Sequence, residues 1–306
     1  MKNIITRNVL SHTIKKIEGA YAPATIRAYK SNFEKFILFC ENISECALPA
    51  ESNLVAQYVK ALTSGHLKSN SIRIAVAAIA TIHKLNQAPD PTQDPEVKLE
   101  VRRMYRTLGR ECKQAYGISN ITLHKMLSAT DSNLRGMRDR ALLLIAYDTL
   151  CRRSELVLLQ VEDLILNETQ PEPSFKLRLR RSKTDQDAKG RWLYLGVEAQ
   201  KALNDWLKAT DIQSGKIFRG IRKKVELTEG LNSSQINRIF KKLARKSKLD
   251  PSVVGQISGH SMRVGAAQDL LLSGASLPMI MNRGRWSKTD TVMRYIESAA
   301  MTINIS

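Results

Sequence analysis

Residues 258–267 read Ser258-Gly259-His260-Ser261-Met262-Arg263-Val264-Gly265-Ala266-Ala267. His260 and Arg263 are three residues apart, so a helix that begins near Ser261 would turn both side chains toward one ligand. Gly259 allows the backbone to come close, and the positive end of the helix dipole favours an anion there. The stretch predicts an anion-binding helix start, although a His-x-x-Arg pattern also occurs by chance in helices.

Four further side chains complete a set that suits attack on a phosphodiester without a metal ion: Arg152, Lys183, Trp286 and Tyr295. Arginine can hold a phosphate through two parallel N–H groups, and a phenol can act as a nucleophile. Each residue alone has an ordinary explanation. Tyr295 lies in an apolar helical stripe, Lys183 lies in a polar turn, and Arg152 follows an apolar helix. Only the combination indicates catalysis.

The chain has a large excess of positive charge. Its 306 residues hold 48 Lys and Arg against 29 Asp and Glu, a formal net charge of +19. Residues 1–116 hold 17 basic and 10 acidic side chains, and residues 117–306 hold 31 and 19. An excess in both parts predicts a clamp around a nucleic-acid duplex, the alternative being a basic protein that is merely soluble.

The four cysteines, Cys40, Cys46, Cys112 and Cys151, form no Cys-x-x-Cys pair and have no histidine at zinc spacing. We therefore expect reduced thiols and no metal or other cofactor. The polar start of the chain resembles no secretory signal, and the longest apolar stretch, residues 141–147, is too short to span a bilayer. These features predict a cytoplasmic protein with no membrane association.

Apolar residues at helical spacing predict an all-helical first domain over residues 1–115. Helices are expected over residues 25–40, 54–62, 71–85 and 97–112, with a proline-containing break at residues 87–94. The last helix carries one cationic face, formed by Arg102, Arg103, Arg106 and Arg110. This face could bind DNA, and an ordinary solvated helix surface explains it equally well.

Residues 116–306 are predicted to form a second domain that mixes helices with a few strands. Phe175, Leu177 and Leu179 alternate with basic residues, which is the period of a strand, and residues 191–195 are expected to return beside it. Arg178, Arg180 and Arg181 at this strand are further candidates for DNA binding. Helices are expected over residues 122–129, 136–150, 155–159, 198–209, 233–247, 261–272, 276–282 and 288–299.

Several ordered motifs resemble those of the tyrosine recombinase (phage integrase) family. The segment Thr149-Leu150-Cys151-Arg152-Arg153-Ser154-Glu155-Leu156 is similar to the family's first-arginine motif, and residues 258–267 are similar to the second. The segments Arg181-Ser182-Lys183-Thr184, Gly284-Arg285-Trp286-Ser287 and Val292-Met293-Arg294-Tyr295-Ile296 complete the pattern. The resemblance covers roughly residues 136–300, and over residues 1–115 only the basic, helical character matches.

The resemblance implies a mainly α fold with two domains. The first would be an all-helical core-binding (SAM-like) bundle, and the second a mixed α+β catalytic domain with a small antiparallel sheet. It also implies a site-specific recombinase that cleaves and rejoins DNA through a 3′-phosphotyrosine and exchanges strands via a Holliday junction. The partners would be double-stranded DNA with a paired inverted-repeat site and a homotetramer on two such sites, in a bacterial, phage or plasmid context.

The resemblance also assigns roles to individual residues. Tyr295 would attack phosphorus, Lys183 would protonate the leaving oxygen, and Arg152 and Arg263 would hold the phosphate. His260 would donate a hydrogen bond or shuttle the proton of Tyr295, and Trp286 would offer its indole N–H and pack against the site. Glu155 would hold Arg152 or the region of His260 in place, and its spacing favours Arg152 over Arg153 as the phosphate ligand. Arginines would thus stand in for the divalent ions that many phosphoryl-transfer enzymes use.

Two other functions fit parts of the pattern. A type IB topoisomerase uses similar chemistry, and relaxation of supercoiled plasmids that lack any target site would identify it. A DNA-binding regulator that has lost catalysis would form no phosphotyrosine on its own site. The chain's small size argues against the first, and its filled catalytic positions argue against the second.

Overall fold

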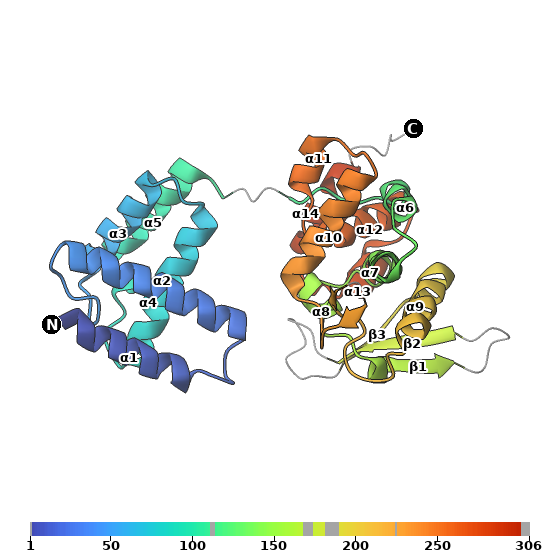
Figure 1. The fold of residues 1–306 in the computed structure, drawn as a ribbon. Helices are drawn as coiled ribbons and strands as arrows, with labels where there is room; N and C mark the ends of the chain where they lie inside the picture. The colour runs from blue at the N-terminus through green and yellow to red at the C-terminus, as the bar shows by residue number, and fades with distance from the viewer. Residues whose placement is uncertain (1, 111–113, 168–173, 181–189, 224, 301–306) are drawn as a thin grey trace. The chain divides into compact units, whose positions relative to one another are not determined.

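The computed structural model describes residues 2–110, 114–167, 174–180, 190–223 and 225–300. The chain divides into two compact units, Met1–Cys112 and Lys113–Ser306. Among its described residues, the first unit has helices and no strand, and the second combines helices with a small antiparallel sheet (Figure 1). The predicted mainly α fold class is therefore confirmed.

The first unit is built from five α-helices and one short 3₁₀ turn within the described residues. They are α1 (Lys2–Lys16), α2 (Pro23–Asn42), α3 (Ser52–Ser64), α4 (Ser69–Leu85), η1 (Pro91–Gln93) and α5 (Pro95–Leu108). Pro23 and Pro95 begin their helices, where the missing N–H of proline costs nothing. The prediction that the last helix runs to residue 112 was wrong, because Gly109 takes a φ of 72° and ends α5 at Leu108.

Helix α1 was not predicted from the sequence. Its buried apolar side chains are Leu10 and Ile14, followed just after the helix by Ile17, at spacings of four and three residues. The first two turns of the helix are largely polar or exposed, so the apolar stripe is too short to dominate the pattern. These residues join Phe33, Phe36 and other apolar side chains of α2, α3 and α4 in one core.

In its described residues, the second unit combines helices with five short strands. Its helices are α6 (Asn120–Ser128), α7 (Leu134–Thr149), α8 (Arg153–Leu156), α9 (Val197–Thr210), α10 (Ser233–Lys246), α11 (Pro251–Gln256), α12 (Ser261–Leu272), α13 (Leu277–Gly284) and α14 (Thr289–Ala300), with the 3₁₀ turn η2 (Val161–Asp163). Its strands are β1 (Leu164–Asn167), β2 (Ser174–Leu179), β3 (Arg191–Leu193), β4 (Ile221–Arg222) and β5 (Glu226–Leu227). Strands β1, β4 and β5 and helix α11 were not predicted.

The three-stranded sheet has the order β1-β2-β3, and all its pairs are antiparallel. Leu177 pairs with Leu164 on one side and with Leu193 on the other. Leu177 and Leu179 are buried while Arg178 and Arg180 are exposed, as the period of two predicts. Helix α9 contacts β2 and also packs against α7, which connects the sheet to the core of the unit (Figure 1).

The second unit begins with a segment that crosses helices α11 and α12. The backbone N–H groups of Tyr116 and Ile118 donate to the carbonyls of Gln256 and Ser261, at 3.3 and 3.0 Å. Gly265 of α12 faces this segment, and a Cβ added there would lie 1.9 Å from the Ile118 carbonyl oxygen. The close contact therefore needs a glycine, and it fixes the position of α12.

Among the described residues, no helix is both long and apolar enough to cross a membrane.

A buried histidine predicts that the first unit is destabilised by acid. The His83 Nε2 atom accepts a hydrogen bond from the Ala50 N–H at 3.0 Å, and Nδ1 lies 2.8 Å from the Ile79 carbonyl oxygen, so the ring is neutral. Burial lowers the pKa of His83 below its usual 6.5, against weaker opposing effects of Ile79 and Asp90. The unfolded state therefore binds this proton more readily, and the free energy of unfolding falls as the pH drops below about 6.5.

The loss should approach about 1.4 kcal/mol per pH unit until the folded-state pKa is reached. Urea unfolding followed by circular dichroism between pH 5 and 8 measures it. His83→Gln keeps an acceptor but cannot titrate, so its slope over this range should be smaller. Equal slopes in the two proteins would contradict the prediction.

The contact between Gly265 and Ile118 predicts a large effect of one methyl group. Gly265→Ala should lower the free energy of unfolding by about 3 kcal/mol, because the backbone at Ile118 must move. Gly255→Ala is the matched control, since a Cβ there meets nothing within 4 Å and alanine favours a helix. We expect this control to change stability by less than about 1 kcal/mol in urea unfolding. Similar losses in both variants would contradict the close contact.

Candidate active site

Arg152 lies in the sharp turn between α7 and α8. Helix α7 ends at Thr149, Leu150 takes a left-handed φ of 50°, and Arg152 is the residue before α8. The Arg152 backbone N–H donates to Glu155 Oε2 at 2.9 Å, and its Nη1 donates to Glu155 Oε1 at 2.7 Å. Glu155 is buried, whereas the Arg152 side chain is 17% exposed. The carboxylate thus orients a guanidinium that still reaches solvent.

Arg153 takes a different direction from its neighbour. It is exposed, and its side chain lies against Gly259, where a Cβ would come within 2.6 Å of the Arg153 Cδ atom. The geometry therefore favours Arg152 as the arginine that Glu155 orients.

Arg263 lies one turn inside α12 and is 1% exposed. Its Nη1 donates to the Leu150 carbonyl and its Nη2 to the Gly284 carbonyl, the latter at 2.6 Å. Both carbonyls lie at helix C-termini, of α7 and α13, where unpaired oxygens and the helix dipole favour a cation. This single side chain therefore joins the ends of two helices to the start of a third.

Trp286 covers the Arg263 guanidinium. The Arg263 Cζ atom lies 4.1 Å from the centroid of the Trp286 ring, which is a cation–π contact. Gly284 makes room for the indole, because a Cβ there would lie 1.8 Å from the Trp286 Cζ3 atom. Trp286 is therefore held between the end of α13 and Arg263.

Tyr295 lies on α14 beside Trp286, with ring centroids 5.5 Å apart. The side chain is half-buried, at the edge of a small core that contains Val292 and Ile296. Its backbone carbonyl accepts from the side-chain amides of Gln114 and Gln268, each at 3.1 Å. The Tyr295 side chain is thus not enclosed in the interior, and a negative charge on its phenol would raise the pKa of Arg263.

The site is strongly electropositive. Burial, together with the neighbouring Arg152 and Arg285, lowers the pKa of Arg263 to about 9. Burial also lowers the pKa of His260, with contributions from Arg263, Arg153 and Arg152. Burial alone would raise the pKa of Glu155, but the Arg152 N–H and two guanidinium groups hold it below its usual value. One carboxylate thus pairs with two guanidinium groups, and Arg263 adds a third positive charge nearby, so the excess favours an anion.

Arg285 was not predicted as a functional residue. It follows α13 in a left-handed conformation, and its buried guanidinium lies 3.1 Å from Glu155 Oε2. The residues beside Arg285 in the sequence do not indicate that it is buried and paired, because its partners come from the turn between α7 and α8.

Two predicted site residues, Lys183 and Arg181, lie outside the described residues. Arg180 forms an ion pair with Asp163, and the Arg178 guanidinium lies 6.0 Å from the Trp192 ring. Among the described residues, no group of three or more His, Cys, Asp and Glu side chains is arranged to hold a metal ion.

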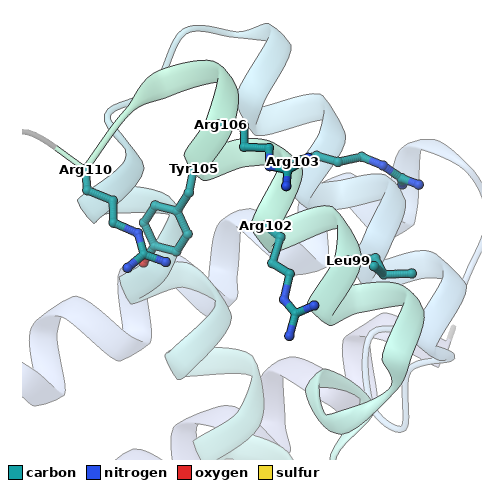
Figure 2. Close-up of a pocket in the computed structure, with 6 residues that line it drawn as sticks. All are labelled: Leu99, Arg102, Arg103, Tyr105, Arg106 and Arg110. Carbon is teal, nitrogen blue, oxygen red and sulfur yellow. The ribbon is translucent and has the colours of Figure 1, made fainter.

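The predicted arginine face of α5 lines a surface pocket in the first unit (Figure 2). Its lining residues are Leu99, Arg102, Arg103, Tyr105, Arg106 and Arg110. Arg110 stacks on the Tyr105 ring at 4.4 Å, and Arg103 pairs with Glu100 at 2.8 Å. All four arginines are exposed, so the pocket presents concentrated positive charge to solvent.

The chain is similar to recombinases over most of its length. An integrase/recombinase XerD homolog of Selenomonas ruminantium is 28% identical over 294 residues, with 92% of this chain and 84% of the relative covered. Recombinase Cre of Escherichia phage P1 is 26% identical over 295 residues, with 91% and 85% covered.

Solved structures share the fold. XerH site-specific recombinase bound to a palindromic difH substrate superimposes with a TM-score of 0.68 at 17% identity, covering 95% of this chain and 81% of that one. A lambda integrase dimer bound to a core site gives a TM-score of 0.60 at 14% identity, with 95% and 76% covered. Residues 118–301 match the Phage integrase family. Since this match spans more than half of the sequence, the chain belongs to the phage integrase family.

Proposed function

We propose that Tyr295 is the nucleophile of a site-specific DNA recombinase and that Arg152 and Arg263 hold the phosphate it attacks. As a phage integrase family member, the chain is a tyrosine-type recombinase that cleaves and rejoins DNA. One observation carries the residue assignment. Arg263 is held by two helix ends under Trp286, and Tyr295 lies against the same indole.

The first chemical step forms one bond and breaks another. The Tyr295 oxygen attacks phosphorus, and the bond from phosphorus to the 5′ oxygen breaks, which leaves a 3′-phosphotyrosine and a 5′-hydroxyl. Negative charge grows on the non-bridging oxygens during attack, and preorganised guanidinium groups stabilise it most effectively. Glu155 holds Arg152 and two helix C-termini hold Arg263, so both guanidinium groups are preorganised.

Protons must leave the phenol and reach the departing oxygen. Because burial and nearby arginines lower the pKa of His260, its imidazole is neutral near pH 7 and can accept the proton of Tyr295. Lys183 would donate a proton to the 5′ oxygen. The Trp286 indole has an N–H donor and no acceptor, so Trp286 can donate a hydrogen bond and pack against the site but cannot accept a proton.

The second step reverses the first on another duplex. A 5′-hydroxyl from the partner DNA attacks the phosphotyrosine, restores a phosphodiester and frees Tyr295. The covalent intermediate conserves the energy of the broken bond, so strand exchange through a Holliday junction needs neither ATP nor a metal ion.

The substrate is double-stranded DNA with paired inverted repeats, bound by a homotetramer that joins two sites. The XerH structure contains a palindromic difH substrate, and the lambda integrase structure contains a dimer on a core site. The net charge of +19 and the exposed arginines of α5 and β2 support phosphate contacts in this chain. We expect the protein to act in the cytoplasm on bacterial, phage or plasmid DNA, as a recombinase of a mobile element would.

Replacing the nucleophile should abolish covalent capture of DNA. Duplexes recovered by the purified protein from a randomised pool provide the substrate, and the protein–DNA adduct is quantified in EDTA on a denaturing gel. Tyr295→Phe should reduce the adduct more than about 1,000-fold, because the attacking oxygen is removed.

Tyr194→Phe is the matched control for this experiment. Tyr194 follows β3, contacts Arg283 at 4.0 Å and is exposed, so Tyr194→Phe should keep the wild-type adduct yield. Equal adduct from Tyr295→Phe and the wild type would refute the nucleophile assignment.

If Lys183 is the proton donor, the cleavage defect of a Lys183 variant should depend on the leaving group. Lys183→Ala should slow cleavage by about 100- to 10,000-fold on ordinary DNA, because the 5′ alkoxide leaves poorly without a proton. A substrate with sulfur at the 5′ bridging position needs no protonation and should restore most of the rate. Lys201→Ala, an exposed lysine on α9, should behave as wild type on both substrates. A Lys183→Ala defect that sulfur does not relieve would remove Lys183 from this role.

A further inference from the structure

Arg285 adopts a backbone conformation that few L-residues take. It lies directly after α13 with φ 57° and ψ 46°, in the left-handed region. Non-glycine residues persist in that region only when their surroundings fix them. The side chain is 5% exposed, so the surroundings that fix it are inside the molecule.

The Arg285 guanidinium bridges the turn between α13 and α14 to the turn between α7 and α8. Its Nη1 donates to the Thr149 carbonyl at 2.9 Å. Its Nη2 donates to Glu155 Oε2 at 3.1 Å and lies 3.4 Å from the Leu150 carbonyl oxygen. Carbonyls at a helix C-terminus and a buried carboxylate together stabilise the buried cation.

Glu155 is consequently held from two sides. Arg152 donates to Oε1 at 2.7 Å and, through its backbone N–H, to Oε2 at 2.9 Å, while Arg285 donates to Oε2. A carboxylate fixed by two guanidinium groups cannot rotate freely, so it gives Arg152 one direction. Arg285 already pairs with this carboxylate, whereas the described hydrogen-bond partners of Arg263 are neutral carbonyls. The charge of Arg263, rather than that of Arg285, is therefore left for a phosphate.

Trp286 depends on the same turn. It directly follows Arg285, and its indole lies over Arg263 and beside Tyr295. Release of the Arg285 side chain would free the backbone at the point from which Trp286 enters the site.

We propose that Arg285 is a positioning residue, which fixes Glu155 and thereby Arg152, and anchors the turn that presents Trp286. This inference rests on the proposed function, because it assumes that Arg152 and Trp286 stabilise the phosphate. It predicts a loss of cleavage rate without a matching loss of DNA affinity, since Arg285 does not contact DNA.

The decisive variant is Arg285→Gly. Glycine accepts the left-handed backbone and removes the whole side chain, including the guanidinium. On a duplex selected by the wild type, single-turnover adduct formation should slow by about 10- to 100-fold, as is usual for residues that orient a ligand of the reacting group. The dissociation constant for the duplex should stay within about twofold.

Three further readouts separate positioning from a merely structural role. Guanidinium chloride at millimolar concentration should restore part of the rate of Arg285→Gly, because the cavity accepts the missing group. The acidic limb of the pH–rate profile should move to higher pH in this variant, because Arg285 helps to lower the pKa of Glu155. In a Glu155→Gln background, Arg285→Gly should have a much smaller effect, since the two residues act in series.

Arg283→Gln is the matched control. It removes one positive charge from the same turn, but Arg283 stacks on Tyr194 at 4.0 Å and has no ion pair with Glu155 among the described residues. We expect its cleavage rate to stay within about twofold of wild type. Arg285→Lys keeps the charge but cannot bridge three acceptors, so it should be slower than wild type and faster than Arg285→Gly.

Several outcomes would overturn the inference. A folded Arg285→Gly that cleaves as fast as wild type would do so, as would a rate loss that equals its loss of DNA affinity or adds fully to that of Glu155→Gln. If Arg285→Gly fails to fold, Arg285→Lys decides, and a wild-type rate would reject the proposal. A wild type that forms no adduct at all would instead contradict the proposed function itself.

Discussion

The second unit depends on the burial of one charged side chain, that of Arg263. Removing a guanidinium from water is costly, and the cost is met here by backbone carbonyls rather than by a carboxylate in direct contact. The two carbonyls belong to the C-termini of α7 and α13, so three helices must end or begin at the same place for the charge to be tolerated. Fold and site are therefore specified together.

Glu155 makes the remaining positive charges compatible with one another. Arg152 and Arg285 approach its two oxygens, and the carboxylate separates groups that would otherwise repel. A net positive charge remains, and burial together with this charge lowers the pKa of both His260 and Arg263. A phosphodiester that enters supplies the missing negative charge, and the additional charge of the transition state is favoured still more.

Much of this arrangement was predictable from local sequence. The alternation from Phe175 to Leu179 predicted β2, and the apolar run within residues 136–150 predicted the buried helix α7. The motifs around Arg152, Arg263 and Tyr295 identified residues that the fold brings close together. Each of these predictions depends on residues that lie close together in the sequence, or on the family resemblance, which relates distant motifs to one site.

Other features could not be predicted because they depend on distant partners. Arg285 meets Glu155 across 130 residues of sequence, and nothing beside it in the chain indicates its left-handed backbone. The apolar stripe of α1 is short, and β4 and β5 pair over only two residues each. None of these elements is long enough for a helical or strand periodicity to be recognised in the sequence. Lys183 lies outside the described residues, so its assignment still rests on the motif.

The segment that opens the second unit has a mechanical consequence. The Gln114 side chain donates to the Tyr295 carbonyl on α14, and the Ile118 N–H donates to the carbonyl of Ser261, the first residue of α12. Residues 114–118 are therefore hydrogen-bonded to both the helix of Tyr295 and the helix of Arg263. A displacement of this segment would reach both helices at once.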